Sequence, residues 1–188
     1  MCGGRGSRLG GDTEKPLVAV AGTPMVERVL AALETAERVD DVVAVASPHA
    51  PATRDRLRDR DDVAVIDAPG DGYVADLGVA LARVGRPVLT VASDLPLLEG
   101  ACLDRVLDRF SGASLAAYVP VAAKRCLGVS VDATTTVGGR AVAPTGVNVV
   151  ADGADDERTV CDDDRLAVNA NRPRDLRVAA ALLEARDG

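Results

Sequence analysis

The sequence predicts a three-layer, doubly wound α/β fold with a mostly parallel sheet. Short apolar runs of strand length alternate with segments of helical periodicity, as in successive βαβ units. The runs are rich in β-branched residues and are bounded by turn residues, which is typical of strands buried on both faces. The 188 residues contain no linker and no internal repeat, so we expect one domain over residues 1–188.

The first half of the chain is predicted to supply three strands and three helices. The strands are expected at residues 42–47, 63–67 and 88–94. The helices are expected at residues 24–33, 51–58 and 73–82, where prolines at positions 24 and 51 suit a first helical turn.

The second half continues the alternation. A helix is predicted at residues 101–110, strands at 114–121 and 146–151, and an amphipathic helix at 173–185, after a short apolar run at 166–168. The acidic stretch of residues 152–164 is predicted to be a solvated loop.

A glycine-rich segment opens the chain. Residues 1–17 hold five glycines among the cations Arg5, Arg8 and Lys15. Glycine lets backbone N–H groups approach a ligand closely, and converging cations suit a polyphosphate. The segment matches neither the Walker A loop nor the dinucleotide-binding G-x-G-x-x-G pattern. It therefore predicts a triphosphate cradle, the alternative being a disordered terminus.

The residues before this loop depart from the expected fold. In doubly wound folds the phosphate loop follows a first, central strand, but here the loop begins at residue 2. Either the natural start lies upstream and the first strand is truncated, or the sheet lacks a central member. We favour truncation.

Asp94 follows a predicted buried strand, in Ser93-Asp94-Leu95-Pro96. The carboxyl ends of parallel strands are where such sheets hold ligands, and Mg²⁺ bound to phosphates takes one or two carboxylates. Asp94 is therefore a candidate magnesium ligand. The alternative is a helix N-cap, a position that aspartate favours.

Composition excludes several classes of protein. A net charge of −7 argues against a nucleic-acid surface, and no apolar run is long enough to span a bilayer. Cys2, Cys102, Cys126 and Cys161 form no metal-ligand spacing, so we expect free thiols in the cytoplasm. Abundant aspartate and scarce lysine resemble proteins of halophilic cells.

Longer stretches carry a family resemblance. The loop and the Ser93–Pro96 stretch are shared by nucleotidyltransferases with a Rossmann-like fold, including the molybdopterin guanylyltransferases. Residues 47–53, 67–77, 144–148 and 168–176 resemble the archaeal GTP:adenosylcobinamide-phosphate guanylyltransferases of cobalamin synthesis. The chain departs from that family in its missing first strand and in Arg172, where threonine is usual.

The resemblance implies roles for individual residues. Arg8 and Lys15 would neutralise charge on the α-phosphate and pyrophosphate, and Asp94 would bind Mg²⁺. The GTP phosphates would be bound by Gly3, Gly4, Gly6 and Ser7, with Arg5 at the rim. The guanosine would lie near Ser47, Asp67, Gly72 and Tyr73. The opposite side of the cleft would be lined by Gly146, Asn148, Asn169 and Asn171, for which turn and strand-end chemistry is the alternative.

The implied reaction transfers GMP from GTP to adenosylcobinamide phosphate and releases pyrophosphate. Because the acceptor phosphate is already anionic, catalysis requires positioning and electrostatic stabilisation rather than a dedicated base. The alternatives are a molybdenum cofactor guanylyltransferase, another MobA-like nucleotidyltransferase, and a nucleotide-binding protein without turnover. The sequence leaves the oligomeric state open, a homodimer included.

Overall fold

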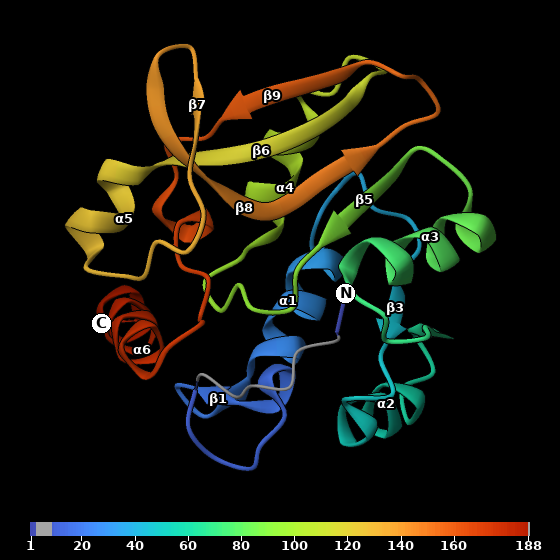
Figure 1. The fold of residues 1–188 in the computed structure, drawn as a ribbon. Helices are drawn as coiled ribbons and strands as arrows, with labels where there is room; N and C mark the ends of the chain where they lie inside the picture. Colours follow the sequence, from blue (N-terminus) through green and yellow to red (C-terminus); the bar gives the residue numbers. More distant parts are fainter. Residues whose placement is uncertain (3–8, 188) are drawn as a thin grey trace.

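The computed structural model describes residues 1–2 and 9–187 (Figure 1). Its strands are β1 (Ala19–Val20), β2 (Thr23–Pro24), β3 (Val43–Ala46), β4 (Ala64–Asp67), β5 (Val88–Val91), β6 (Ser114–Pro120), β7 (Thr135–Val137), β8 (Arg140–Val150) and β9 (Asp156–Val160). Its α-helices are α1 (Met25–Glu34), α2 (Pro51–Arg58), α3 (Tyr73–Val84), α4 (Gly100–Leu107), α5 (Val121–Leu127) and α6 (Pro173–Asp187). Two 3₁₀ turns, η1 (Lys15–Leu17) and η2 (Asp164–Leu166), complete the list.

Most of the central strands run in one direction. β3 and β4 are parallel. β5 and β6 flank β8, and both are antiparallel to it, so they share a direction, and β9 is parallel to β6. Among these strands β8 alone runs the opposite way, which confirms the predicted α/β class with a mostly parallel sheet.

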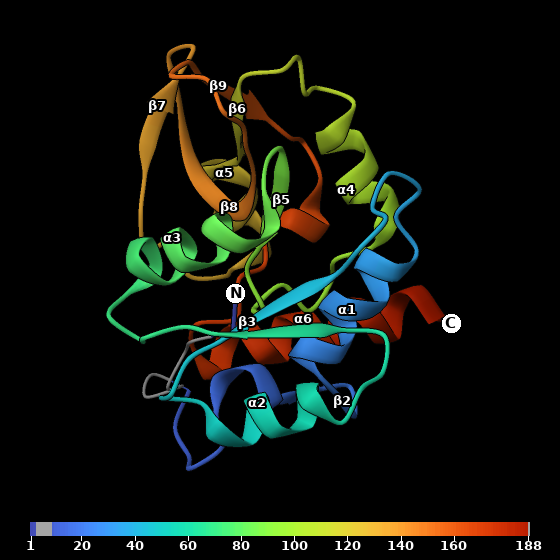
Figure 2. The same cartoon turned by 90° about the vertical axis from the view of Figure 1, so that its right-hand side faces the viewer.

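Helices cover both faces of β3 and β4. Alternate residues of β3 face opposite ways, so Ala44 packs with α1 and α2 while Val45 packs with Ala80 of α3. Figure 2 shows α2 and α3 on the two sides of β3. Farther along the sheet, α1 and α4 pack together over the buried side chains of β5, β6 and β8. The arrangement is the expected one of three layers.

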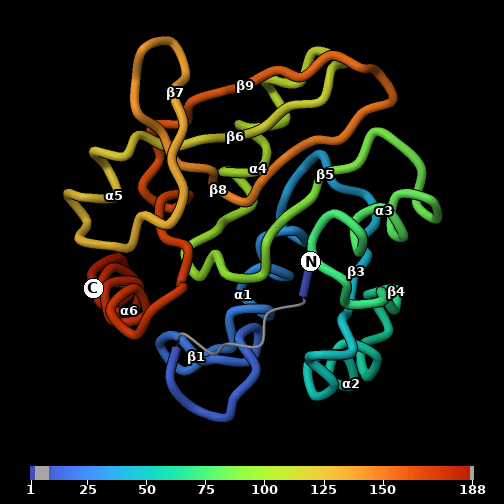
Figure 3. Tube along the Cα trace, in the orientation of Figure 1, coloured from blue at the N-terminus to red at the C-terminus, as the bar shows by residue number. Residues whose placement is uncertain are grey.

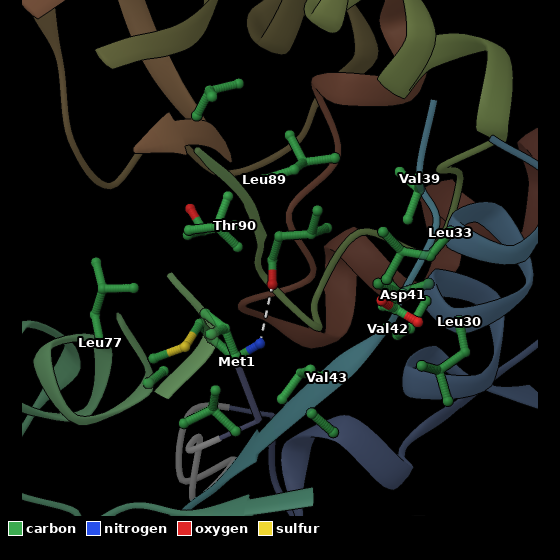
Figure 4. A pocket seen from close by; sticks show the side chains of 18 of the residues that line it. Met1, Leu30, Leu33, Val39, Asp41, Val42, Val43, Leu77, Leu89 and Thr90 are labelled. Carbon is green, nitrogen blue, oxygen red and sulfur yellow. Dashed lines mark hydrogen bonds between the residues drawn. The ribbon is translucent and has the colours of Figure 1, made fainter. Parts of the chain in front are cut away.

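A cavity of about 500 Å³ separates β3 from β5 and is lined by apolar side chains of α1 on one face and α3 on the other (Figure 4). We call this cavity the slot. Met1 and Cys2 lie at one end of the slot. The Met1 amino nitrogen donates to the Val91 carbonyl (3.0 Å), and Cys2 forms a parallel bridge with Ala46. Figure 3 shows this end of the chain between the two strands.

The contacts of Met1 and Cys2 give the direction of β5 relative to β3 and mark the position of the expected central strand. Val91 and Ala46 are the last residues of β5 and β3, so both strands end beside the same dipeptide and run in parallel. Among residues 1–2 and 9–187, only Met1 and Cys2 form backbone contacts in the position between β3 and β5. The sheet thus has a central position that is paired over the length of one dipeptide.

Several sequence-based boundaries were wrong in instructive ways. The acidic stretch 152–164 contains β9, because the edge of β6 offers a ladder of backbone partners that polar residues can occupy as well as apolar ones. β8 begins at Arg140 rather than near residue 146, and the short helix α5 was missed. The apolar run 166–168 begins with the last residue of the 3₁₀ turn η2 and is buried.

Two expectations from composition can be compared with the structure. All four cysteines are free. In the part of the chain that the structure describes, no helix is long and apolar enough to cross a membrane.

Candidate active site

Four residues predicted as site residues meet beyond the carboxyl end of β5. The Lys15 Nζ donates to Asp94 Oδ2 (2.5 Å) and to Asn171 Oδ1 (2.6 Å). The Asn169 Nδ2 donates to Asp94 Oδ1 (3.3 Å). The side chains of Lys15 and Asp94 are 17% and 16% exposed, so the pair lies in a recess that remains open to solvent. We call these four residues the Lys15–Asp94 cluster.

Asp94 reaches the cluster because β5 ends three residues earlier, at Val91. The chain then turns through a buried segment and enters α4 at Gly100, so Asp94 does not cap that helix. The Asp94 carbonyl accepts from the Ala170 N–H (2.9 Å), which ties this turn to the asparagine segment. The helix-cap alternative for Asp94 is therefore wrong.

Lys15 is positioned by Glu14, which points toward α2. The Glu14 carboxylate accepts from the N–H groups of Ala52 (2.8 Å) and Thr53 (2.6 Å) in the first turn of α2. An acidic group at a helix N-terminus satisfies free N–H groups and complements the helix dipole. Glu14 and Lys15 thus connect α2 to the Lys15–Asp94 cluster.

Asn169 contacts Asp94 and Asn171 contacts Lys15. Both side chains therefore point to the same side of their segment, which agrees with a spacing of two residues in an extended chain. Their segment is anchored by Asp175, which is fully buried. Asp175 accepts from the backbone N–H groups of Asn171 (3.0 Å) and Arg172 (2.9 Å). It is the third residue of α6 and reaches back to the N-cap, as in a capping box.

Lys124, for which no site role was predicted, lies beside the cluster. Lys124 is 3% exposed, and its Nζ donates to the Ala167 carbonyl (2.6 Å) and to Asn169 Oδ1 (3.1 Å). Burial lowers the pKa of Lys124, and attraction to Asp175 and Asp94 opposes that shift. The scarcity of lysine in the sequence was the available signal.

Gly146 lies in β8 where the pairing with β6 shifts register between Ala116 and Tyr118. Its φ of +86° favours glycine, and a Cβ there would lie 2.8 Å from Ala92 Cβ and 3.6 Å from Asn169 Nδ2. Gly146 is thus adjacent to the cluster. Asn148 is two residues farther along the same face of β8 and pairs with Thr90 in β5.

The predicted guanosine residues lie at the ends of β3 and β4. Ser47 is buried and accepts from the His49 N–H, while Tyr73 begins α3 half-exposed. Gly72 is the N-cap of α3 with a φ of +112°. Asp67 is instead paired with Arg58 of α2 (2.5 Å), on the other side of β3 from α3. Asp67 thus has its ion-pair partner on α2, and all four roles remain predictions.

The remaining predicted site residues lie outside the described residues. They are the loop residues Gly3, Gly4, Arg5, Gly6, Ser7 and Arg8.

The cluster can be tested for its fit to a metal ion. Within residues 1–2 and 9–187, no three histidine, cysteine, aspartate or glutamate side chains gather in a metal-binding group. Asp94 is a single carboxylate beside a lysine, which suits a hard cation that also takes phosphate oxygens and waters. The residues therefore fit Mg²⁺ carried by a triphosphate.

Comparisons with known proteins agree with this geometry. The sequence profile of the MobA-like NTP transferase domain matches residues 1–131. An adenosylcobinamide-phosphate guanylyltransferase of Methanocaldococcus jannaschii is 30% identical over all of this chain and 97% of its own length. A probable molybdenum cofactor guanylyltransferase of Thermococcus kodakarensis is 36% identical over 64% of this chain and 56% of its own length.

Solved structures share the fold. A 4-diphosphocytidyl-2C-methyl-D-erythritol synthase superposes with a TM-score of 0.68 at 18% identity, covering 90% of this chain and 92% of that one. A CMP:2-keto-3-deoxy-manno-octonic acid synthetase complexed with CTP gives 0.67 at 12% identity, covering 96% of each chain. The chain therefore belongs to the MobA-like NTP transferase family and is a nucleotidyltransferase.

Proposed function

We propose that the protein transfers GMP from GTP to adenosylcobinamide phosphate, giving adenosylcobinamide-GDP and pyrophosphate, as one catalytic domain over residues 1–188. The observation that carries the choice of acceptor is the length of one match. Similarity to the Methanocaldococcus jannaschii guanylyltransferase extends over the whole chain. It therefore includes Asn169 and Asn171, which lie beyond the matched family domain at residues 1–131.

In the proposed reaction, a phosphate oxygen of the acceptor attacks the α-phosphorus of GTP. The new P–O bond forms as the bond from the α-phosphorus to the bridging oxygen breaks, and pyrophosphate leaves with the electron pair. Lys15 stabilises the charge on the α-phosphate and the leaving group, since its ammonium group lies in the recess beyond β5. No general base is needed because the acceptor phosphate is ionised.

Asp94 would hold Mg²⁺ through its carboxylate, and the ion would neutralise phosphate charge when bound. Asn171, which accepts from Lys15, and Asn169, which donates to Asp94, hold these two charged groups at defined positions. Such fixed geometry lowers the barrier because the reacting groups are oriented in advance.

The nucleoside would lie across the ends of β3 and β4. The half-exposed ring of Tyr73 offers an apolar face near the loop that contains Gly72. The glycine-rich loop, with Gly3, Gly4, Gly6 and Ser7, would bind the phosphates, with Arg5 and Arg8 as further cations. These assignments depend on the resemblance and on the place of the loop between Cys2 and Leu9 in the sequence. Free GTP makes the cytoplasm the expected compartment.

Pyrophosphate release tests the proposal. The protein is incubated with Mg²⁺ and GTP, ATP or CTP, and with adenosylcobinamide phosphate, molybdopterin or no acceptor. We expect release with GTP that depends on the acceptor. Lys15→Ala should reduce it by about 10²–10³-fold, while Arg38→Ala, which breaks an exposed ion pair with Asp108, should leave it unchanged. GTP turnover with molybdopterin alone would overturn the acceptor, and GTP binding without turnover would indicate a binding protein.

The molybdenum cofactor guanylyltransferase is the second candidate. It is favoured by the higher identity of the Thermococcus kodakarensis relative within the aligned region, 36% against 30%. That alignment covers 64% of this chain, however, and we rank it second for that reason.

A further inference from the structure

Lys124 is a buried cation that the proposed mechanism does not use. Its side chain reaches from α5 across to the segment between η2 and α6. Burying an ammonium group costs free energy unless the group is well paired, and a methionine would occupy similar space without that desolvation. Packing alone therefore does not explain a charged residue at this position.

The contacts of Asn169 supply one. Its Oδ1 accepts from Lys124 Nζ (3.1 Å), while its Nδ2 donates to the Thr145 carbonyl (2.8 Å) and to Asp94 Oδ1 (3.3 Å). An ammonium group has donors and no acceptor, so the amide must present its oxygen to Lys124. A flipped amide would place N–H against ammonium and oxygen against both a carbonyl and a carboxylate.

We propose that Lys124 is a positioning residue of the nucleotidyl-transfer site, which acts by fixing the amide of Asn169 so that its N–H group holds Asp94. The inference rests on the proposed function because it concerns the same site. With Oδ1 of Asp94 held by Asn169 and Oδ2 facing Lys15, the carboxylate plane is set before any ligand arrives. Lys124 contacts neither Asp94 nor Lys15 in the hydrogen bonds that the structure shows.

A purely structural lysine is the competing explanation. The bond to the Ala167 carbonyl (2.6 Å) ties α5 to the neighbouring segment whether or not Asn169 is oriented. The two roles differ in one respect. A tie between segments affects the free energy of unfolding, whereas a positioning role affects the interaction of Asp94 with a metal–nucleotide complex.

The experiment compares Lys124→Met, Asn169→Ala and the double variant with the wild-type protein. Titration calorimetry gives the Kd of GTP with and without Mg²⁺, and their ratio measures the metal-dependent gain. Removing a partner that orients a ligating group typically costs 10–100-fold. We expect Lys124→Met to lower the gain by about tenfold and kcat by about 10–100-fold, with less effect on the KM for acceptor. Arg125→Met, on the exposed side of the same helix, is the matched control and should behave as wild type.

The double variant decides whether Lys124 acts through Asn169. If it does, the double variant loses no more of the metal-dependent gain and of kcat than Asn169→Ala alone. Losses that multiply, or a folded Lys124→Met protein with wild-type gain and kcat, would overturn the inference while leaving the proposed function intact. A wild-type protein that fails to bind GTP would overturn both.

Folding is checked by thermal unfolding of each variant. If Lys124→Met does not fold, Lys124→Arg replaces it, because a guanidinium keeps the charge but cannot place one nitrogen between the Ala167 and Asn169 oxygens in the same way. We expect a reduced metal-dependent gain for this variant at near-native Tm. A wild-type gain would overturn the positioning role.

Discussion

The Lys15 Nζ lies 2.5 Å from Asp94 Oδ2, although the two residues are separated by 79 positions in the sequence. One belongs to the turn that follows the glycine-rich loop, and the other follows a central strand. Each group thus neutralises the other in the absence of ligand. In the proposed function, a triphosphate with its cation would replace that pairing, because the phosphates attract Lys15 and the cation attracts Asp94.

Lys15→Ala should reduce turnover far more than stability. Removing one donor that stabilises transition-state charge costs about 10²–10³ in kcat, whereas a partly exposed ion pair contributes about 1 kcal/mol or less to folding. Kinetics and denaturant unfolding measure the two effects. A variant that loses stability, and whose folded fraction keeps the wild-type kcat, would indicate a structural lysine.

Asp94→Asn should weaken the dependence of activity on Mg²⁺. The amide keeps the shape of the side chain but loses the charge that attracts a hard cation. The magnesium concentration for half-maximal activity is expected to rise by about tenfold or more. Asp108→Asn, on an exposed ion pair, is the control. Activity equal to wild type at every magnesium concentration would remove the assigned role.

Gly146→Ala should lower both stability and activity. Its backbone has a φ of +86°, and the added Cβ would meet Ala92 Cβ at 2.8 Å and approach Asn169. We expect a loss of about 1–3 kcal/mol in the free energy of unfolding. Gly22→Ala separates the two causes, because Gly22 has a φ of +79° with no neighbour within 4 Å of an added Cβ. Equal losses in both variants would show that crowding contributes nothing.

Asp163 should make stability depend on pH. Burial raises the pKa of its carboxyl, but hydrogen bonds from Arg165 and Arg105 outweigh that effect and hold the pKa well below its usual range. The stabilisation is therefore present above the unfolded pKa of about 3.9 and is lost as pH falls below it.

Asp163→Asn tests this assignment. The variant should lose about 1.5–3 kcal/mol at pH 7, and the difference from wild type should shrink below about pH 4. Asp162→Asn, whose side chain is 70% exposed, should change little. A loss in Asp163→Asn that is independent of pH would contradict the role of the charge.

Filling the slot should stabilise the protein. The residues of α1 and α3 that line it are apolar, and the Met1 nitrogen already bonds to the Val91 carbonyl in the manner of a strand residue. Four β-branched residues fused ahead of Met1 would extend between β3 and β5. Burial of each apolar side chain would contribute about 1.5–3 kcal/mol to the free energy of unfolding, and the entropy lost on ordering the residues would offset part of this gain. A Gly/Ser extension of equal length is the control. Equal Tm values for the two fusions would contradict the prediction.

The sequence by itself determined the α/β class, most helices and the strands β3, β4, β5 and β6, because hydrophobic periodicity is a local property of the sequence. It also singled out Asp94 from its position after a strand and Lys15 from its place in the glycine-rich segment, whereas Asn169 and Asn171 came from the family resemblance. Polar β9 was missed because its strand is specified by the exposed edge of β6 rather than by its own pattern.

Only the tertiary structure decided which of the candidate residues meet. It placed Lys15 against Asp94 and Asn171, and it directed Asp67 toward Arg58 instead of the other predicted guanosine residues. It also brought Lys124, 45 positions from Asn169, into the same network. Such contacts depend on how loops from distant parts of the chain pack at one sheet edge, and a linear pattern does not contain those distances.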